Sequence, residues 1–191
     1  MKKVSKYILL IIVFLPLLYF RDFTPNNELK YLSIADEALR SGTYLTFTHE
    51  GSIYTDKPPL YLWLIMLCKQ LLGHHSMLLL GLFSFIPALL ILYVMEKWLS
   101  PYIPSNYLFT FSLMLITTGL FAGSAIVLRM DMLMSLFILL ALYTFYRMYT
   151  GQAGKGAKVL LPLYIFLALF TKGPLGLIIP FFSILVFLLY Q

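Results

Sequence analysis

Residues 21–63 have the sequence RDFTPNNELKYLSIADEALRSGTYLTFTHEGSIYTDKPPLYLW, and the rest of the chain is organised around this polar stretch. It carries six of the eight acidic residues in a chain that is 61% hydrophobic. Soluble proteins have about a quarter of their residues charged, whereas this chain has 12% and a mean hydropathy of +0.88. The composition therefore predicts a membrane protein whose chemistry begins in a single long polar loop.

The first half of this loop has the pattern of an amphipathic helix. Pro25 and the pair Asn26–Asn27 provide a stop and an N-cap, and Gly42 follows the last periodic residue as a C-cap. Such a helix can lie on a membrane surface, with Asn27, Lys30 and Tyr31 on one side of its first turn. Its apolar stripe comprises Leu29, Leu32, Ile34, Ala35 or Asp36, Ala38 and Leu39.

The second half of the loop, Gly51–Pro59, predicts irregular structure and ends in Asp56-Lys57-Pro58-Pro59. Proline fixes its own backbone and disfavours a helical conformation in the residue before it. We therefore expect Asp56 and Lys57 to be held in an extended turn directly ahead of the next apolar segment.

The remaining apolar segments predict an all-α polytopic membrane protein. Six of them approach the roughly 20 residues that cross a bilayer, while Tyr61–Leu72 is shorter and predicts a second interfacial helix. Residues 4–20 form the first span, 21–74 the outer loop with its interfacial helices, and 75–191 the further spans. The predicted spans are Val4–Phe20, His75–Met95, Asn106–Leu128, Met132–Tyr149, Val159–Thr171 and Pro174–Tyr190.

The topology follows from the ends of these segments. Lys2, Lys3 and Lys6 precede the first apolar run, and no cleavage site of small residues follows it. We therefore predict an uncleaved first span with a cytoplasmic N-terminus. Alternation then places residues 21–63, residues 129–131 and Lys172 outside.

Several cations on the outer side oppose the usual bias towards cytoplasmic Lys and Arg. Binding of an anion is one explanation, and snorkelling to the interface is an equally good one for Arg21, Arg40 and Lys69. Binding is favoured for four cations that lie at segment junctions beside other polar residues and that alternation brings to one face. These are Lys30, Lys57, Arg129 and Lys172.

Asp131, the pair His74–His75 and Cys68 are further polar residues whose chemistry bears on function. Asp131 is an ionisable residue at the end of a span and is a functional candidate, with an ion pair to Arg129 as the alternative. The neighbouring His74 and His75 favour interfacial polar residues over a metal site, because adjacent helix residues point apart. The single cysteine, Cys68, excludes a disulfide framework.

Five short motifs follow one another along the chain: NNELKY at residues 26–31, SGTYLT at 41–46, DKPPLYLW at 56–63, RMD at 129–131 and TKGP at 171–174. In this order they resemble the motifs of the GT-C membrane glycosyltransferases, in the group that contains the bacterial lipid A aminoarabinose transferases and the protein O-mannosyltransferases. The DKPP turn is the specific element of this pattern. The resemblance covers nearly the whole chain but only the first half of a typical member, so we expect the N-terminal part of a longer protein.

The resemblance implies an inverting transfer of a sugar from a polyprenyl phosphate to a lipid A-like lipid or a protein. The reaction would occur on the periplasmic face of the bacterial inner membrane, with membrane lipids but no nucleic acid as further partners. Cations must stabilise the charge that develops on the departing phosphate. The residues expected to bind the donor phosphate are Lys57, Lys30, Tyr31, Arg129 and Lys172.

The same chemistry needs a carboxylate to orient or deprotonate the acceptor, and a carboxylate can also help to hold a divalent cation. Asp56, Asp131 and Glu28 are the candidates, and Asp56 is the candidate metal ligand. At the catalytic position where the family has its first acid this chain has Asn27, whose amide cannot act as a base. Three explanations remain open: Glu28 or Asp131 takes that role, the acceptor is already an anion, or this member is inactive.

Two other classes of function remain open. A transporter half would show broken helices at corresponding positions of two repeats, and the sequence shows no such symmetry. A noncatalytic membrane scaffold is made more plausible by Asn27.

Overall fold

The computed structural model describes residues 3–25 and 27–191, so Asn26, half of the predicted N-cap, lies outside the described residues. Within these ranges the chain forms nine helices and one β-hairpin. The elements are α1 Lys3–Phe20, α2 Glu28–Ser41, β1 Phe47–His49, β2 Ser52–Tyr54, α3 Leu60–Leu72, α4 Met77–Leu99, α5 Ser105–Thr117, α6 Gly119–Ile126, α7 Met130–Tyr149, α8 Ala157–Lys172 and α9 Leu175–Leu189.

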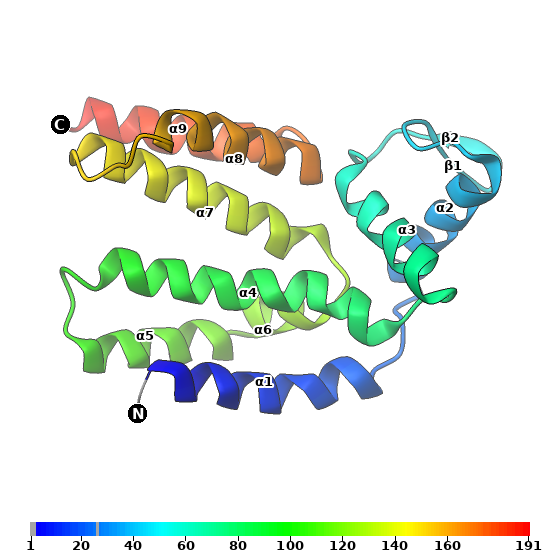
Figure 1. Ribbon diagram of the computed structural model, residues 1–191, viewed down its shortest axis with the longest axis horizontal. Helices are drawn as coiled ribbons and strands as arrows, with labels where there is room; N and C mark the ends of the chain where they lie inside the picture. Colours follow the sequence, from blue (N-terminus) through cyan, green and yellow to red (C-terminus); the bar gives the residue numbers. More distant parts are fainter. Residues whose placement is uncertain (1–2, 26) are drawn as a thin grey trace.

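The helices form a bundle with a smaller lobe beyond one of its ends (Figure 1). The lobe contains α2, α3 and the hairpin, and α1, α4, α5, α7, α8 and α9 run along the bundle. The start of α1, the loops after α4 and α7, and the end of α9 lie at the opposite end of the bundle (Figure 1). The polar loop and these connections are thus separated by the length of the bundle.

The predicted number of six spans is not confirmed. Within the described residues, α4 and α7 are long and apolar enough to cross a membrane, and α5 with α6 adds a third span if the pair is taken together. Residues Ser5–Phe20, α3 and α9 are apolar but shorter. Two or three such helices make the chain a multi-pass membrane protein.

The predicted span Asn106–Leu128 is wrong as one straight helix, because α5 and α6 meet at 69°. Thr118 between them has an extended backbone, with φ −64° and ψ 129°. The hydroxyls of Thr117 and Thr118 donate to carbonyls three or four residues earlier, at 2.8 and 2.7 Å. Such bonds bend helices, and the following Gly119 weakens helix continuation further.

The predicted amphipathic helix is confirmed as α2, which ends at Gly42 in the left-handed conformation (φ 68°) with its N–H donating to the carbonyl of Ala38. Ile34, Ala35 and Ala38 are fully buried, as the stripe predicts. Asn27 occupies the predicted N-cap position, but its backbone is helical and its side chain makes no capping hydrogen bond.

The predicted all-α class is confirmed, but the polar loop also contains a two-stranded antiparallel hairpin that the sequence did not predict. Phe47 pairs with Tyr54, and the turn residues Glu50 and Gly51 have φ of 53° and 76°. Positive φ at both positions suits a tight hairpin turn. The N–H of Glu50 donates to the Glu37 carboxylate at 2.8 Å, which ties the turn to α2. Strands of three residues are too short for a clear alternating pattern in the sequence.

Asp36 joins the lobe to the start of the bundle. Its Oδ1 accepts from Lys69 of α3 at 2.6 Å and lies 2.7 Å from Nε2 of His75, just before α4. Burial would raise the pKa of Asp36, but the hydrogen bonds from Lys69 and His75 outweigh it and lower the pKa. The predicted alternative of interfacial snorkelling is therefore wrong for Lys69, because its ammonium binds Asp36. His75 contacts the same carboxylate.

This geometry predicts an acid-dependent loss of stability. Because the folded-state pKa of Asp36 is below its ordinary value of 3.8, its contribution is present above that value and disappears as the pH falls through the lowered pKa. Thermal unfolding in detergent, followed down to about pH 3, should therefore show a steeper acid loss for the natural protein than for Asp36→Asn. Asp22→Asn, at an exposed aspartate, is the control and should keep the natural slope.

Candidate active site

A polar pocket of about 260 Å³ lies where the lobe meets the bundle. Its walls come from the start of α2, the turn before α3, the start of α7 and the end of α8. The structure thus brings together seven of the nine predicted site residues, from segments far apart in the sequence. The lining residues are Asn27, Tyr31, Asp56, Lys57, Arg129, Met130, Asp131 and Lys172.

Lys57 and Asp56 form one side of the pocket. The Lys57 ammonium lies 2.9 Å from Oδ1 of Asp56, and the Tyr54 hydroxyl donates to Oδ2 at 3.4 Å. The Lys57 ammonium beside it lowers the pKa of Asp56. A carboxyl group with a lowered pKa is a weak base near neutral pH, so Asp56 is better suited to holding Lys57 than to removing a proton.

Asp131 forms the opposite side, with two cations. Lys172 donates to its Oδ1, and Nε of Arg129 lies 3.8 Å from Oδ2. The predicted alternative of a local pair with Arg129 is thus only part of the arrangement, because the closer partner comes from the end of α8. Gly173, with φ 92°, follows Lys172 and allows the chain to turn directly into α9.

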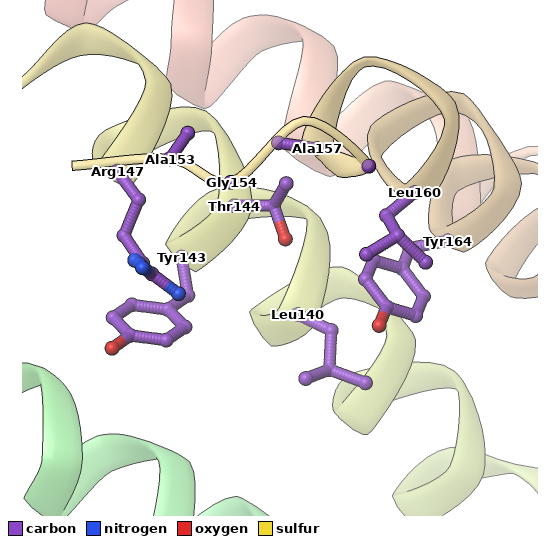
Figure 2. A pocket seen from close by; sticks show the side chains of 10 residues that line it. Leu140, Tyr143, Thr144, Arg147, Ala153, Gly154, Ala157, Leu160 and Tyr164 are labelled. Carbon is purple, nitrogen blue, oxygen red and sulfur yellow. The ribbon is translucent and has the colours of Figure 1, made fainter. Parts of the chain in front are cut away.

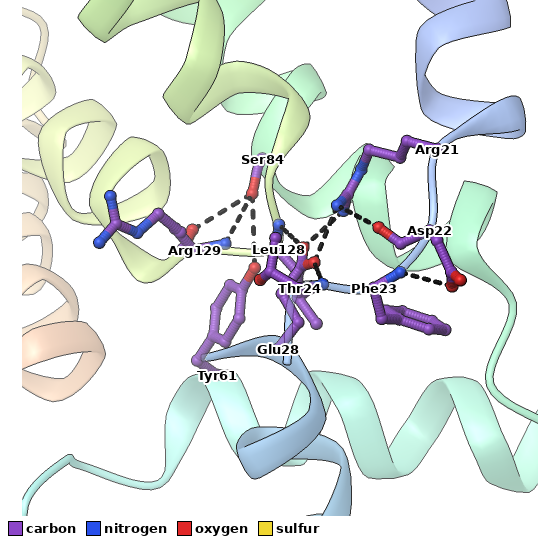
Figure 3. Close-up of polar contacts among 9 residues, drawn as sticks. All are labelled: Arg21, Asp22, Phe23, Thr24, Glu28, Tyr61, Ser84, Leu128 and Arg129. Carbon is purple, nitrogen blue, oxygen red and sulfur yellow. Dashed lines mark hydrogen bonds and ion pairs between the residues drawn. The ribbon is translucent and has the colours of Figure 1, made fainter. Parts of the chain in front are cut away.

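The hydroxyl of Ser84 holds the backbone of Arg129 in place, and the hydroxyl of Tyr61 lies beside it (Figure 3). The hydroxyl of Ser84 in α4 donates to the carbonyl of Arg129 at 3.2 Å and accepts from its N–H at 3.3 Å. Tyr61 in α3 is fully buried, and its hydroxyl lies 3.4 Å from that of Ser84. Tyr61 therefore packs inside the protein, between α3 and α4. Ser84 was missed, although a serine within an apolar span is a signal of helix packing.

Glu28 does not line the pocket. It is fully buried, and its carboxylate accepts from Arg21 at 2.8 and 2.5 Å, from the N–H of Thr24 at 2.6 Å and from the N–H of Leu128 at 2.5 Å. Burial would raise the pKa of Glu28, but these donors outweigh it and lower the pKa.

The predicted catalytic role of Glu28 therefore has no support from this geometry, since no lone pair is left for an acceptor. Glu28 instead fastens the start of α2 to the segment before α7. The sequence predicted that Arg21 binds an external anion or snorkels to the membrane interface. In the structure its guanidinium pairs with the Glu28 carboxylate instead. The signal that could have found the pair is a lone acid at a helix start, seven residues after a lone arginine.

Lys30 lies beside the pocket but does not line it, because its ammonium stands 5.0 Å from the centroid of the Tyr54 ring. Tyr31 does line it, and burial raises the pKa of its hydroxyl. Tyr31 therefore stays protonated at neutral pH and can donate a hydrogen bond.

An apolar groove of about 370 Å³ adjoins the polar pocket. It runs along the bend between α5 and α6 and the first turns of α7, and it contains Leu120, Phe121 and Met132. Arg129 and Asp131 line both the groove and the pocket. The charged pocket and the apolar groove thus meet at these two residues.

The donor set does not fit a divalent cation. In residues 3–25 and 27–191 no group of three or more His, Cys, Asp or Glu side chains is placed to hold a metal ion. The predicted metal ligand, Asp56, is paired with Lys57.

The comparisons with known proteins agree with this fold. No family model matches the sequence. An uncharacterized protein of Aquifex aeolicus (strain VF5) is 28% identical over 187 residues, which is 92% of this chain and 36% of that protein. Crystal structures of ArnT from Cupriavidus metallidurans, in the apo state and bound to undecaprenyl phosphate, match 98% and 97% of this chain with a TM-score of 0.77 and 20% identity.

These matches show that the chain shares its fold with part of the ArnT structures. The chain spans about a third of the length of each of these proteins, 36% in every case.

Proposed function

We propose that this chain is the N-terminal part of an inverting membrane glycosyltransferase that takes a sugar from a polyprenyl-phosphate donor. The observation that carries the proposal is that the polar pocket and the apolar groove share Arg129 and Asp131 in their linings. A donor of this class has a charged phosphate head and a long apolar tail, and needs both surfaces side by side.

The charges of the pocket suit the departing phosphate. Lys57, Arg129 and Lys172 face Asp56 and Asp131, so the lining carries one excess positive charge. When the sugar leaves, the donor phosphodiester becomes a phosphate monoester with a charge of about −1.5 to −2 at pH 7. Preorganised cations stabilise this increase of charge and therefore accelerate the reaction. Lys57 and Arg129 are the proposed donor-phosphate ligands, with Tyr31 as a hydrogen-bond donor.

Asp131 is the proposed residue for the acceptor. It lies in the first turn of α7, at the boundary between pocket and groove, and Lys172 and Arg129 fix its carboxylate. The acceptor oxygen forms a bond to the anomeric carbon as the bond from that carbon to the phosphate oxygen breaks. Asp131 takes the proton of a hydroxyl acceptor, and an acceptor that is already an anion requires no proton transfer.

The acceptor class is a lipid or a protein at the outer face of the bacterial inner membrane, which is the periplasmic side when the start of α1 is cytoplasmic. The likeness to ArnT bound to undecaprenyl phosphate supports the donor class. The cations of this pocket run against the usual distribution, and binding of the anionic donor accounts for them.

The test is transfer of radiolabelled sugar from a polyprenyl-phosphate pool to membrane lipids and proteins, with the complete coding sequence expressed. Label should appear in one acceptor class and depend on the protein. A protein that is inserted and folded but transfers nothing would overturn the enzyme and leave the scaffold or transporter classes.

Asn27→Asp tests where the base lies. Asn27 lines the pocket, so an aspartate there would raise transfer by about 10²–10⁴-fold if a general base were simply missing. We expect a change of less than about tenfold, because Asp131 or an ionised acceptor already meets this need. The same labelled-transfer assay measures it, and Asn106→Asp, at the opposite end of the bundle, is the matched control.

A further inference from the structure

A second pocket lies at the end of the bundle opposite the candidate active site. It has a volume of about 310 Å³ and is formed by the last turns of α7, the loop after it and the start of α8 (Figure 2). Leu140, Ala157 and Leu160 make its wall apolar, and the rings of Tyr143 and Tyr164 flank it. Ligand pockets of roughly 300–1,000 Å³ are common in proteins. This pocket is within that range and lies where the end of α7 packs against the start of α8.

One cation lines this pocket, and two more occupy positions of the chain next to lining residues. Arg147 lines it, and Lys155 and Lys158 are exposed on the loop and at the start of α8. Residues 132–191 contain no aspartate or glutamate. Glu96, in the last turns of α4, is paired with Lys6 and is buried. The positive charge of these three side chains is therefore not balanced by a carboxylate of the neighbouring segments.

Arg147 is held in a defined position. Its guanidinium donates to the carbonyl of Gln152 at 2.6 Å and lies 5.9 Å from the centroid of the Tyr143 ring. In return the N–H of Gln152 donates to the carbonyl of Arg147 at 2.9 Å. The guanidinium is thereby fixed beside the apolar wall and retains further N–H donors for a ligand.

We propose that this pocket binds an anionic phospholipid, with part of an acyl chain against Leu140 and Leu160 and the phosphate at Arg147, Lys155 and Lys158. Basic pockets between membrane helices recognise anionic headgroups in this way. The charge decides between lipid classes, because a zwitterionic phospholipid brings no net negative charge to the three cations. The site is distinct from the outer pocket and independent of the proposed transfer reaction.

Trp98 is a natural reporter for this site, because its ring lies 5.5 Å from the ring of Tyr143. The complete protein is placed in bilayers that contain brominated phosphatidylglycerol or brominated phosphatidylcholine, and tryptophan quenching is measured. The part of the quenching that Trp98→Phe removes belongs to Trp98. We expect half-maximal quenching of this part at a lower mole fraction of phosphatidylglycerol than of phosphatidylcholine.

Arg147→Gln should reduce this preference by about fivefold, and Lys155→Gln with Lys158→Gln should reduce it further, since each cation near an anionic headgroup contributes about that factor. Lys97→Gln is the matched control, because Lys97 is exposed on α4 at the same end but does not line the pocket. Equal quenching by both lipids, a preference unchanged by Arg147→Gln, or an equal loss in Lys97→Gln would overturn the proposal. Quenching of Trp98 by neither lipid would also overturn it, because a protein segment would then occupy the pocket.

Discussion

Replacing Lys57 by methionine should lower sugar transfer by about 10²–10³-fold, the loss that follows removal of one preorganised group that stabilises transition-state charge. Methionine keeps most of the apolar stem and removes only the ammonium. The ammonium faces the pocket from the turn before α3 and is paired with Asp56 at 2.9 Å. Labelled transfer at saturating donor measures the change in kcat.

The control for this experiment is Lys30→Met. Lys30 is a cation of the same lobe, but it stands over the ring of Tyr54 and does not line the pocket. Its replacement should change transfer by less than about tenfold. Equal losses in the two variants would show that general positive charge in the lobe matters, and would remove Lys57 from its proposed role at the donor phosphate.

Replacing Glu28 by alanine should destabilise the protein by about 3–5 kcal/mol, the usual cost of removing one partner from a buried ion pair. The variant leaves the Arg21 guanidinium and the N–H groups of Thr24 and Leu128 without their acceptor. Unpaired buried donors retain their full cost of desolvation. Thermal unfolding in detergent and resistance to proteolysis measure the loss.

Glu28→Gln should lie between alanine and the natural residue. Its amide oxygen can still accept, but its NH₂ group must face a donor, because both carboxylate oxygens accept from Arg21 and from a backbone N–H. Glu37→Ala is the matched control on α2, since Glu37 binds Thr48 and Glu50 of the hairpin rather than the bundle. A folded Glu28→Gln protein with normal stability and no transfer would instead return Glu28 to a catalytic role.

Local signals carried most of what could be predicted. Gly42 ends α2 in the left-handed conformation, and Lys57 precedes two prolines at the start of α3. These features depend on the backbone preferences of one or a few neighbouring residues, and such preferences can be recognised in the sequence alone. The apolar segments likewise predicted a helical membrane protein, although not how many helices are long enough to span.

The predictions that were wrong or incomplete depend on whether a polar group takes a hydrogen-bond partner nearby in the sequence or far from it. The hydroxyls of Thr117 and Thr118 bond to their own helix and break a segment that hydropathy makes continuous. The turn of the hairpin is held to α2 by the hydrogen bond from the N–H of Glu50 to the carboxylate of Glu37. Hydropathy averages over a window and contains no information about such individual hydrogen bonds.

By itself the sequence determined the membrane class, the polar loop, its amphipathic helix and the list of charged residues from which the pocket is built. Only the tertiary structure decided which of these face one another: Asp131 pairs with Lys172 from the end of α8, and Glu28 is buried against Arg21 and Leu128. The reason is physical. A buried charge must find a partner wherever the fold brings one, and Glu28 and Leu128 are 100 residues apart along the chain. Side-chain type shows that a carboxylate needs donors, but packing of the lobe against the bundle selects which donors it meets.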